Sequence, residues 1–183
     1  MSKLETNTID TISGSTTLTI GDSNTSTIAL KSGATLTNFP ANTPSFSAER
    51  TSDQTITNNT RTTVLFDNEF YDSSNAYDTS TGKFTPQVAG KYYVTANCQL
   101  TGDNYSNLNL GLLELYKNSS VISQGVFDMR NNPPRSVTSS VIIITDMNGS
   151  SDFLLVQAYI KNSSGGTLAV RDMSTFQAFR IIE

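Results

Sequence analysis

The sequence predicts an all-β protein in which residues 45–183 form a single sandwich or jelly roll. Three observations lead to this fold class. Short segments with an apolar side chain at every second position recur through this part of the chain, as in half-buried strands. Clusters of Asn, Asp, Gly and Ser separate these segments, and no stretch shows sustained helical periodicity. A chain of 183 residues can hold one core of this kind together with a short appendage.

Residues 1–44 are the expected appendage, because they hold too few large apolar side chains to offset the conformational entropy lost on ordering them alone. Thr17–Ile20 and Thr27–Leu30 alternate at period two, and Ser13–Thr19 resembles Ser32–Thr37 as a weak repeat. We therefore expect a short intertwined β stem that buries its apolar residues against other chains. A Ser/Thr-rich disordered tail is the alternative. The candidate residues for docking on a larger particle are Ile12, Leu18, Ile20 and Ile28.

Pro40 and Pro44 predict a hinge between the stem and the sandwich. Beyond it the alternation of apolar residues predicts the main strands of the sandwich, each bounded by turn residues. These predicted strands are Thr63–Asp67, Lys91–Thr101, Leu108–Lys117, Val137–Thr145, Asp152–Lys161 and Thr175–Ile182.

The predicted strands differ in how many apolar faces they have. Lys91–Thr101 is apolar on one face only, as expected for a strand with one side in a core. Asp152–Lys161 and Thr175–Ile182 carry apolar side chains on both faces. An antiparallel sheet that is apolar on both faces needs a partner besides its own sandwich, so we expect a contact between subunits. The candidate residues for packing in a trimer are Leu154, Val156, Phe179 and Ile181.

Residues 77–94 read Tyr-Asp-Thr-Ser-Thr-Gly-Lys-Phe-Thr-Pro-Gln-Val-Ala-Gly-Lys-Tyr-Tyr-Val. This stretch resembles the signature of the complement component 1q globular-head family, whose members are jelly-roll relatives of tumour necrosis factor. Pro44–Ala48 and Val64–Asp67 resemble the opening strands of that family, and Thr175–Phe179 resembles its closing motif. The resemblance implies a ten-strand jelly roll that trimerises about a three-fold axis and binds ligands through its loops.

The residues of this signature have a structural explanation of their own. Gly82 and Gly90 are expected where a turn needs a positive φ or a close approach of the backbone. Asp78 is expected to cap its own turn through a side-chain hydrogen bond. The sequence departs from the family pattern at Ala178, where glycine is usual, and at Arg180, where an aliphatic residue is common.

Composition and charge exclude several classes of function. The chain has no histidine and one cysteine, so it lacks Ser-His-Asp and Cys-His nucleophile systems and cannot form an intrachain disulfide. A net charge of −4 without a basic stripe argues against nucleic-acid binding. No apolar run approaches the length of a membrane-spanning helix, and no apolar segment follows Met1, so we expect neither membrane insertion nor a secretory signal peptide. The sequence therefore predicts a protein that is not an enzyme.

Two acidic loops are the candidates for a metal ion. The first contains Asp67–Glu69, Asp72 and Asp78, and the second runs from Asp146–Gly149 to Asp152. Either loop could hold Ca²⁺ through oxygen ligands, although neither has the spacing of a dedicated calcium loop. Ordinary turn chemistry explains both loops, so we predict no cofactor, with Ca²⁺ as the alternative.

Two other loops, Gly102–Asn107 and Arg130–Arg135, are the candidates for recognition of a host glycan or protein. Amide and aromatic side chains in the first suit a sugar, and the second carries arginines on either side of Pro133 and Pro134. The candidate contact residues are Asn104, Tyr105, Arg130 and Arg135.

The stretch from Ile12 to Pro40 is similar in style to the amino-terminal segments of tailed-phage fibres and other virion structural proteins. We therefore expect a homotrimeric phage structural protein at the virion surface. It would serve as a fibre for host attachment or as a capsid decoration that clamps the shell, and residues 1–44 would contact other virion proteins. A free-standing adhesive or signalling ligand of the complement component 1q and tumour necrosis factor type is the alternative. A carbohydrate depolymerase is the third and weakest hypothesis.

Overall fold

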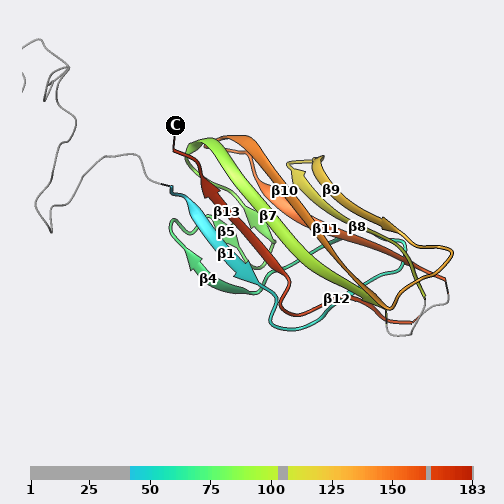
Figure 1. The fold of residues 1–183 in the computed structure, drawn as a ribbon. Helices are drawn as coiled ribbons and strands as arrows, with labels where there is room; N and C mark the ends of the chain where they lie inside the picture. The colour runs from blue at the N-terminus through green and yellow to red at the C-terminus, as the bar shows by residue number, and fades with distance from the viewer. Residues whose placement is uncertain (1–41, 103–106, 164–165, 183) are drawn as a thin grey trace, which may run out of the picture. The chain divides into compact units, whose positions relative to one another are not determined.

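The computed structural model describes residues 42–102, 107–163 and 166–182 (Figure 1). These residues belong to the unit Pro40–Glu183, one of the two into which the chain divides. The predicted stem, with Ile12, Leu18, Ile20 and Ile28, lies outside the described residues. Its intertwined β structure and its docking role therefore stay predictions.

The described residues form thirteen strands and no helix, arranged as two antiparallel sheets that face each other as a sandwich (Figure 1). Ten of the strands have three residues or more, and the other three are two-residue ladders. The all-β jelly-roll class expected from the sequence is confirmed.

The seven-stranded sheet is built around the long strand β7. Along one edge β7 pairs with β10, and along the other it pairs with β13 and, nearer its end, with β12. The sheet continues from β13 through β1 to the edge strand β4, and from β12 to β2. Its strands are β1 (Ser45–Glu49), β2 (Gln54–Ile56), β4 (Asn68–Asp72), β7 (Ala89–Gly102), β10 (Ser136–Asn148), β12 (Leu168–Val170) and β13 (Thr175–Arg180).

The six-stranded sheet has β11 and β8 at its centre, paired antiparallel, with β9 on the outer edge of β8. The short ladders β3 and β6 pair with the other edge of β11, and β5 pairs with β6. Its strands are β3 (Thr62–Thr63), β5 (Tyr77–Asp78), β6 (Lys83–Phe84), β8 (Leu108–Lys117), β9 (Ser120–Asp128) and β11 (Leu154–Asn162).

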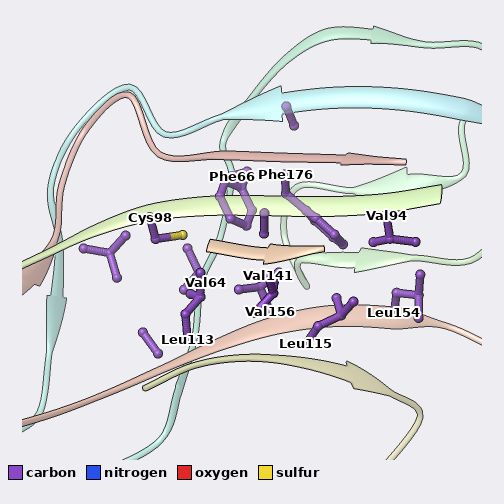
Figure 2. Close-up of a cluster of buried hydrophobic side chains, with 14 of the residues drawn as sticks. Val64, Phe66, Val94, Cys98, Leu113, Leu115, Val141, Leu154, Val156 and Phe176 are labelled. Carbon is purple, nitrogen blue, oxygen red and sulfur yellow. The ribbon is translucent and has the colours of Figure 1, made fainter. Parts of the chain in front are cut away.

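An aromatic cluster fills one part of the core between the sheets. The ring of Phe46 stacks on Tyr77 and Phe84, at centroid distances of 4.7 and 4.6 Å, and meets Phe176 edge-on at 4.9 Å. Aliphatic side chains from both sheets occupy the rest of the core (Figure 2). The signature stretch supplies Tyr77 and Phe84 to this cluster, which explains why its aromatic positions matter for folding.

Two predicted packing residues need a correction. Leu154 and Val156 are completely buried in the core of the single chain, where Figure 2 shows them beside Leu115 and Val141. The prediction that they pack against another subunit is wrong. Both side chains are already buried between the two sheets of their own chain, so they have no exposed surface that a second subunit could contact. The outward face of β11 is instead the one that carries Tyr159.

The single cysteine, Cys98, lies on the core face of β7 and is completely buried. Burial raises the pKa of its thiol to about 12, so the reactive thiolate is absent near neutral pH. We expect a thiol reagent at about pH 8 to leave the native protein unlabelled and to label one thiol per chain once denaturant unfolds it. Rapid labelling without denaturant, followed by mass spectrometry, would show that this part of the core is open.

Candidate binding surfaces

An apolar patch lies on the outward face of the seven-stranded sheet. Tyr93 on β7 is opposite Ile144 on β10 and opposite Phe179 on β13, so these three side chains form a row across the sheet. Ile142, two residues along β10 from Ile144, extends the row on the same face. The exposed fractions are 59% for Ile142, 56% for Ile144 and 39% for Phe179. We call Tyr93, Ile142, Ile144 and Phe179 the sheet patch.

The geometry of the sheet patch explains why its side chains point away from the core of the sandwich. Tyr93 stands between the buried residues Tyr92 and Val94, so the alternation of β7 turns its ring away from the core. The ring stacks on Phe179 with centroids 5.2 Å apart, and this contact restricts the orientation of both aromatic side chains. The patch is therefore an ordered apolar surface made of strands.

Of the four residues predicted to pack in a trimer, Phe179 belongs to the sheet patch. Ile181, whose backbone N–H donates to the carbonyl of Lys91, lies just beyond β13 and is half-buried. Sequence reasoning missed Tyr93, Ile142 and Ile144. A signal for the last two was available, because an uninterrupted apolar run inside a strand must place side chains on both faces of the sheet.

The predicted recognition arginines lie at the end of the sandwich where β7 ends and β10 begins, but they border different hollows. Arg130 pairs with Asp128 at 3.0 Å and lines a hollow formed by residues 128–132. Arg135 lines a neighbouring groove together with Arg171 and Thr101. The other two predicted contact residues, Asn104 and Tyr105, lie outside the part of the chain that the structure describes.

An ion pair between a buried carboxylate and an exposed guanidinium lies on the outward face of the six-stranded sheet. Glu114 on β8 is 1% exposed and accepts hydrogen bonds from Arg61 Nε and Nη2 at 2.7 and 3.0 Å. Gln124 on β9 donates to the same carboxylate at 2.8 Å, and the Arg61 guanidinium stands 5.5 Å from the Tyr159 ring centroid. Both carboxylate oxygens are thus in use. This cluster ties the segment before β3 to the sheet and leaves little capacity to bind a ligand.

The acidic loops use their carboxylates in turns. Asp78 accepts hydrogen bonds from the backbone N–H and hydroxyl of Ser80 and from the hydroxyl of Thr81, which confirms its predicted capping role. Asp152 accepts from the side chains of Asn118 and Lys117. Among the described residues, no three His, Cys, Asp or Glu side chains converge as metal ligands would. The predicted glycine conformations are also confirmed, with φ of 70° at Gly82 and 144° at Gly90.

The stability of the fold should fall in acid because of these turns. The hydroxyls of Ser80 and then Thr81 lower the pKa of Asp78 from 3.8 to about 2, and Asn118 and then Lys117 lower the pKa of Asp152. A carboxyl whose pKa is lower in the folded state stabilises the fold above its unfolded pKa and loses that contribution as the pH falls through its folded pKa. We expect the urea midpoint to fall between about pH 4 and pH 2, and to fall less in Asp78→Asn. An identical acid slope in this variant would contradict the role of the turn.

No helix long and apolar enough to span a membrane occurs in the described ranges. Their two antiparallel sheets, with the long central strand β7 flanked by β10 and β13, define a jelly roll of the kind found in complement component 1q and tumour necrosis factor.

Comparison with known families identifies the chain more closely. The C1q domain family matches residues 45–179, so the chain belongs to this family. No curated protein matches the sequence.

Solved structures show the same fold at low sequence identity. The globular domain of zebrafish complement 1qA protein matches with a TM-score of 0.56 and 18% identity, over 76% of this chain and 98% of that chain. Eiger TNF from S. frugiperda matches with a TM-score of 0.51 and 10% identity, over 76% of this chain and 94% of that chain. The expected resemblance to this family is confirmed for the sandwich.

Proposed function

We propose that this protein is a homotrimeric, non-catalytic binding module in which the sheet patch joins the subunits. The observation that carries the proposal is the sheet patch itself, a row of large apolar side chains held in place by strands and partly exposed in the described sandwich. Ordered apolar surface of this kind typically marks a contact with another protein. Membership of the C1q domain family supports a closed homotrimer, which is the typical assembly of C1q and TNF-like domains.

The setting that we propose for this trimer is the surface of a phage particle. Residues 1–44 would contact other virion proteins, and the sandwich would face outward as an attachment fibre or a capsid decoration. The Ser/Thr-rich repeat style of residues 12–40 supports this setting. In the alternative, a free-standing adhesive or signalling ligand, the same trimer would act without a particle.

The assembly is tested by sedimentation equilibrium on the full chain. The proposal expects a mass of three times 19.8 kDa over a wide range of protein concentration. A mass of 19.8 kDa at micromolar concentration would overturn it.

The setting is tested by probing purified particles with an antibody against the sandwich. Labelling of intact particles at regular positions supports the virion role. A trimer that is absent from particles and is recovered free would favour the adhesive or signalling ligand.

A further inference from the structure

The turn that follows β10 contains an asparagine–glycine pair, Asn148–Gly149, which occurs once in the sequence. In such a pair the backbone nitrogen of the glycine can attack the side-chain amide carbon of the asparagine, because glycine has no Cβ to hinder the approach. The nitrogen forms a bond to Cγ, its proton leaves with the side-chain nitrogen as ammonia, and a five-membered imide remains. Water then opens this ring to aspartate or isoaspartate. Asn148 is exposed, so water has access to it.

The fold requires glycine at position 149, so it keeps the reactive pair. The φ angle of Gly149 is 71°, in the left-handed region that other residues rarely adopt. A Cβ at this position would stand 2.3 Å from the backbone nitrogen of Ala89 and 2.8 Å from the carbonyl carbon of Val88. A bulkier residue, which would slow the ring closure, therefore does not fit against the beginning of β7.

The side-chain amide of Asn148 is held by the turn itself. Its Oδ1 accepts the backbone N–H groups of Ser150, Ser151 and Asp152 at 2.9, 3.0 and 3.0 Å. Its Nδ2 donates to Ser151 Oγ at 3.0 Å. Donors to Oδ1 could also stabilise the oxyanion of the addition step, but they act only if the Gly149 nitrogen reaches Cγ. The backbone of Asn148 therefore decides whether the reaction begins.

The backbone of Asn148 is held in a strand. Asn148 is the last residue of β10, opposite Ala89 on β7, and its N–H donates to Asp152 Oδ2 at 3.0 Å. The carboxylate of Asp152 is anchored in turn by Lys117 Nζ and Asn118 Nδ2, each at 2.9 Å. Closure of the imide ring must rotate the Cα–C bond until the next nitrogen eclipses Cβ, far from the ψ of about +135° of an antiparallel strand. The reaction therefore needs the end of β10 to open.

We infer that Asn148 is a latent deamidation site, which the closed turn protects and which reacts when the end of β10 opens. The reaction is a one-way record of that opening. Isoaspartate routes the chain through the former side-chain carbon, so it cannot return the same oxygen to the three N–H groups of the turn. Aspartate adds a negative charge beside Asp152, whose carboxylate accepts the Asn148 N–H. This inference does not depend on the proposed assembly.

The test is incubation of the full chain in mildly alkaline buffer with and without guanidinium chloride. Peptide mass spectrometry follows deamidation at Asn148, and labelling by an isoaspartate methyltransferase detects the isoaspartyl product. Because only the opened fraction reacts, the rate without denaturant should be lower by at least about tenfold. Equal rates under the two conditions, or a faster reaction of the native chain, would overturn the inference. An unfolded chain that does not deamidate at Asn148 would overturn it as well.

Matched variants test the protection by the turn. Asp152→Ala removes the acceptor of the Asn148 N–H and should raise the native rate by roughly tenfold, because a charged hydrogen bond no longer holds the turn closed. Asp146→Ala removes the same charge two residues before Asn148, but that carboxylate pairs with Lys91 at 3.5 Å, so the native rate should not change. Equal acceleration in both variants would overturn the inference, since local charge would then control the rate.

Circular dichroism shows whether Asp152→Ala is folded. If it is not, Ser151→Ala serves in its place, because it removes only the acceptor of Asn148 Nδ2. This variant should raise the native rate by about threefold and leave the rate in denaturant unchanged. A native rate equal to that of the unsubstituted chain would contradict the protection by the turn.

Discussion

Replacement of Phe46 by alanine is expected to lower the free energy of unfolding by about 3–5 kcal/mol. Phe46 is completely buried and contacts three other rings, those of Tyr77, Phe84 and Phe176. Truncation removes its apolar surface from the core and leaves a cavity between the two sheets, which rigid neighbouring strands cannot close.

The matched control for this prediction is Phe70→Ala. Phe70 is the same residue type on the edge strand β4, with 59% of its surface exposed, so its loss should change stability by no more than about 0.5 kcal/mol. Both variants are compared by urea unfolding at one protein concentration, because dissociation of an oligomer makes stability depend on concentration. Equal effects of the two substitutions would show that the aromatic cluster is not the centre of the core.

Sequence reasoning predicted best the strands with regular alternation. Leu108–Lys117 was expected with the bounds that β8 has, and β7 with the correct core face. It missed β9, whose residues Ser120–Asp128 are mostly exposed and include Gly125. A Cβ at Gly125 would stand 2.4 Å from Ser139 Oγ and 2.8 Å from the carbonyl oxygen of Ser140. The glycine is thus required by the close approach of β10, a contact that the local sequence does not reveal.

For the segment Thr63–Asp67 the sequence predicted a strand that the structure forms only in part. Its alternation predicted a strand, but in the structure only Thr62–Thr63 forms a ladder. Val64 and Phe66 are still buried, as the pattern required. Side chains replace the missing ladder partners, since Phe66 N–H donates to the hydroxyl of Tyr77 and Leu65 N–H donates to Gln54 Oε1. An apolar pattern therefore predicts which side chains are buried. It does not predict whether the backbone pairs as a strand, because the hydrogen-bond partners come from elsewhere in the chain.

The candidate binding surfaces were only partly predictable, because they are formed by residues of different strands that the pairing register of β7 brings together. Arg135 was singled out from its loop, but Arg171 joins it only because β12 and β10 pair with opposite edges of the same end of β7. In the same way Ile144 and Phe179 come from distant parts of the sequence and meet through Tyr93. Neither combination follows from the periodicity of a single strand.

Replacement of Phe179 by glutamate is expected to convert the trimer into a monomer. In the proposed assembly this side chain packs on the neighbouring subunit, and its aromatic partner Tyr93 lies in the same patch. The substitution would place three carboxylates, one from each subunit, in apolar contacts between subunits. Burying a charge in such contacts costs far more free energy than the loss of one apolar contact. The sedimentation mass should fall from three times 19.8 kDa to 19.8 kDa.

The control for this substitution is Val126→Glu, which adds the same charge at a 56% exposed position on the outward face of the six-stranded sheet. That face carries no part of the sheet patch, so Val126→Glu should remain trimeric. Circular dichroism distinguishes dissociation from unfolding, because a folded monomer keeps the β spectrum. A trimer in Phe179→Glu together with a monomer in Val126→Glu would place the subunit contact on the six-stranded sheet, since the charge disrupts whichever apolar face the subunits bury.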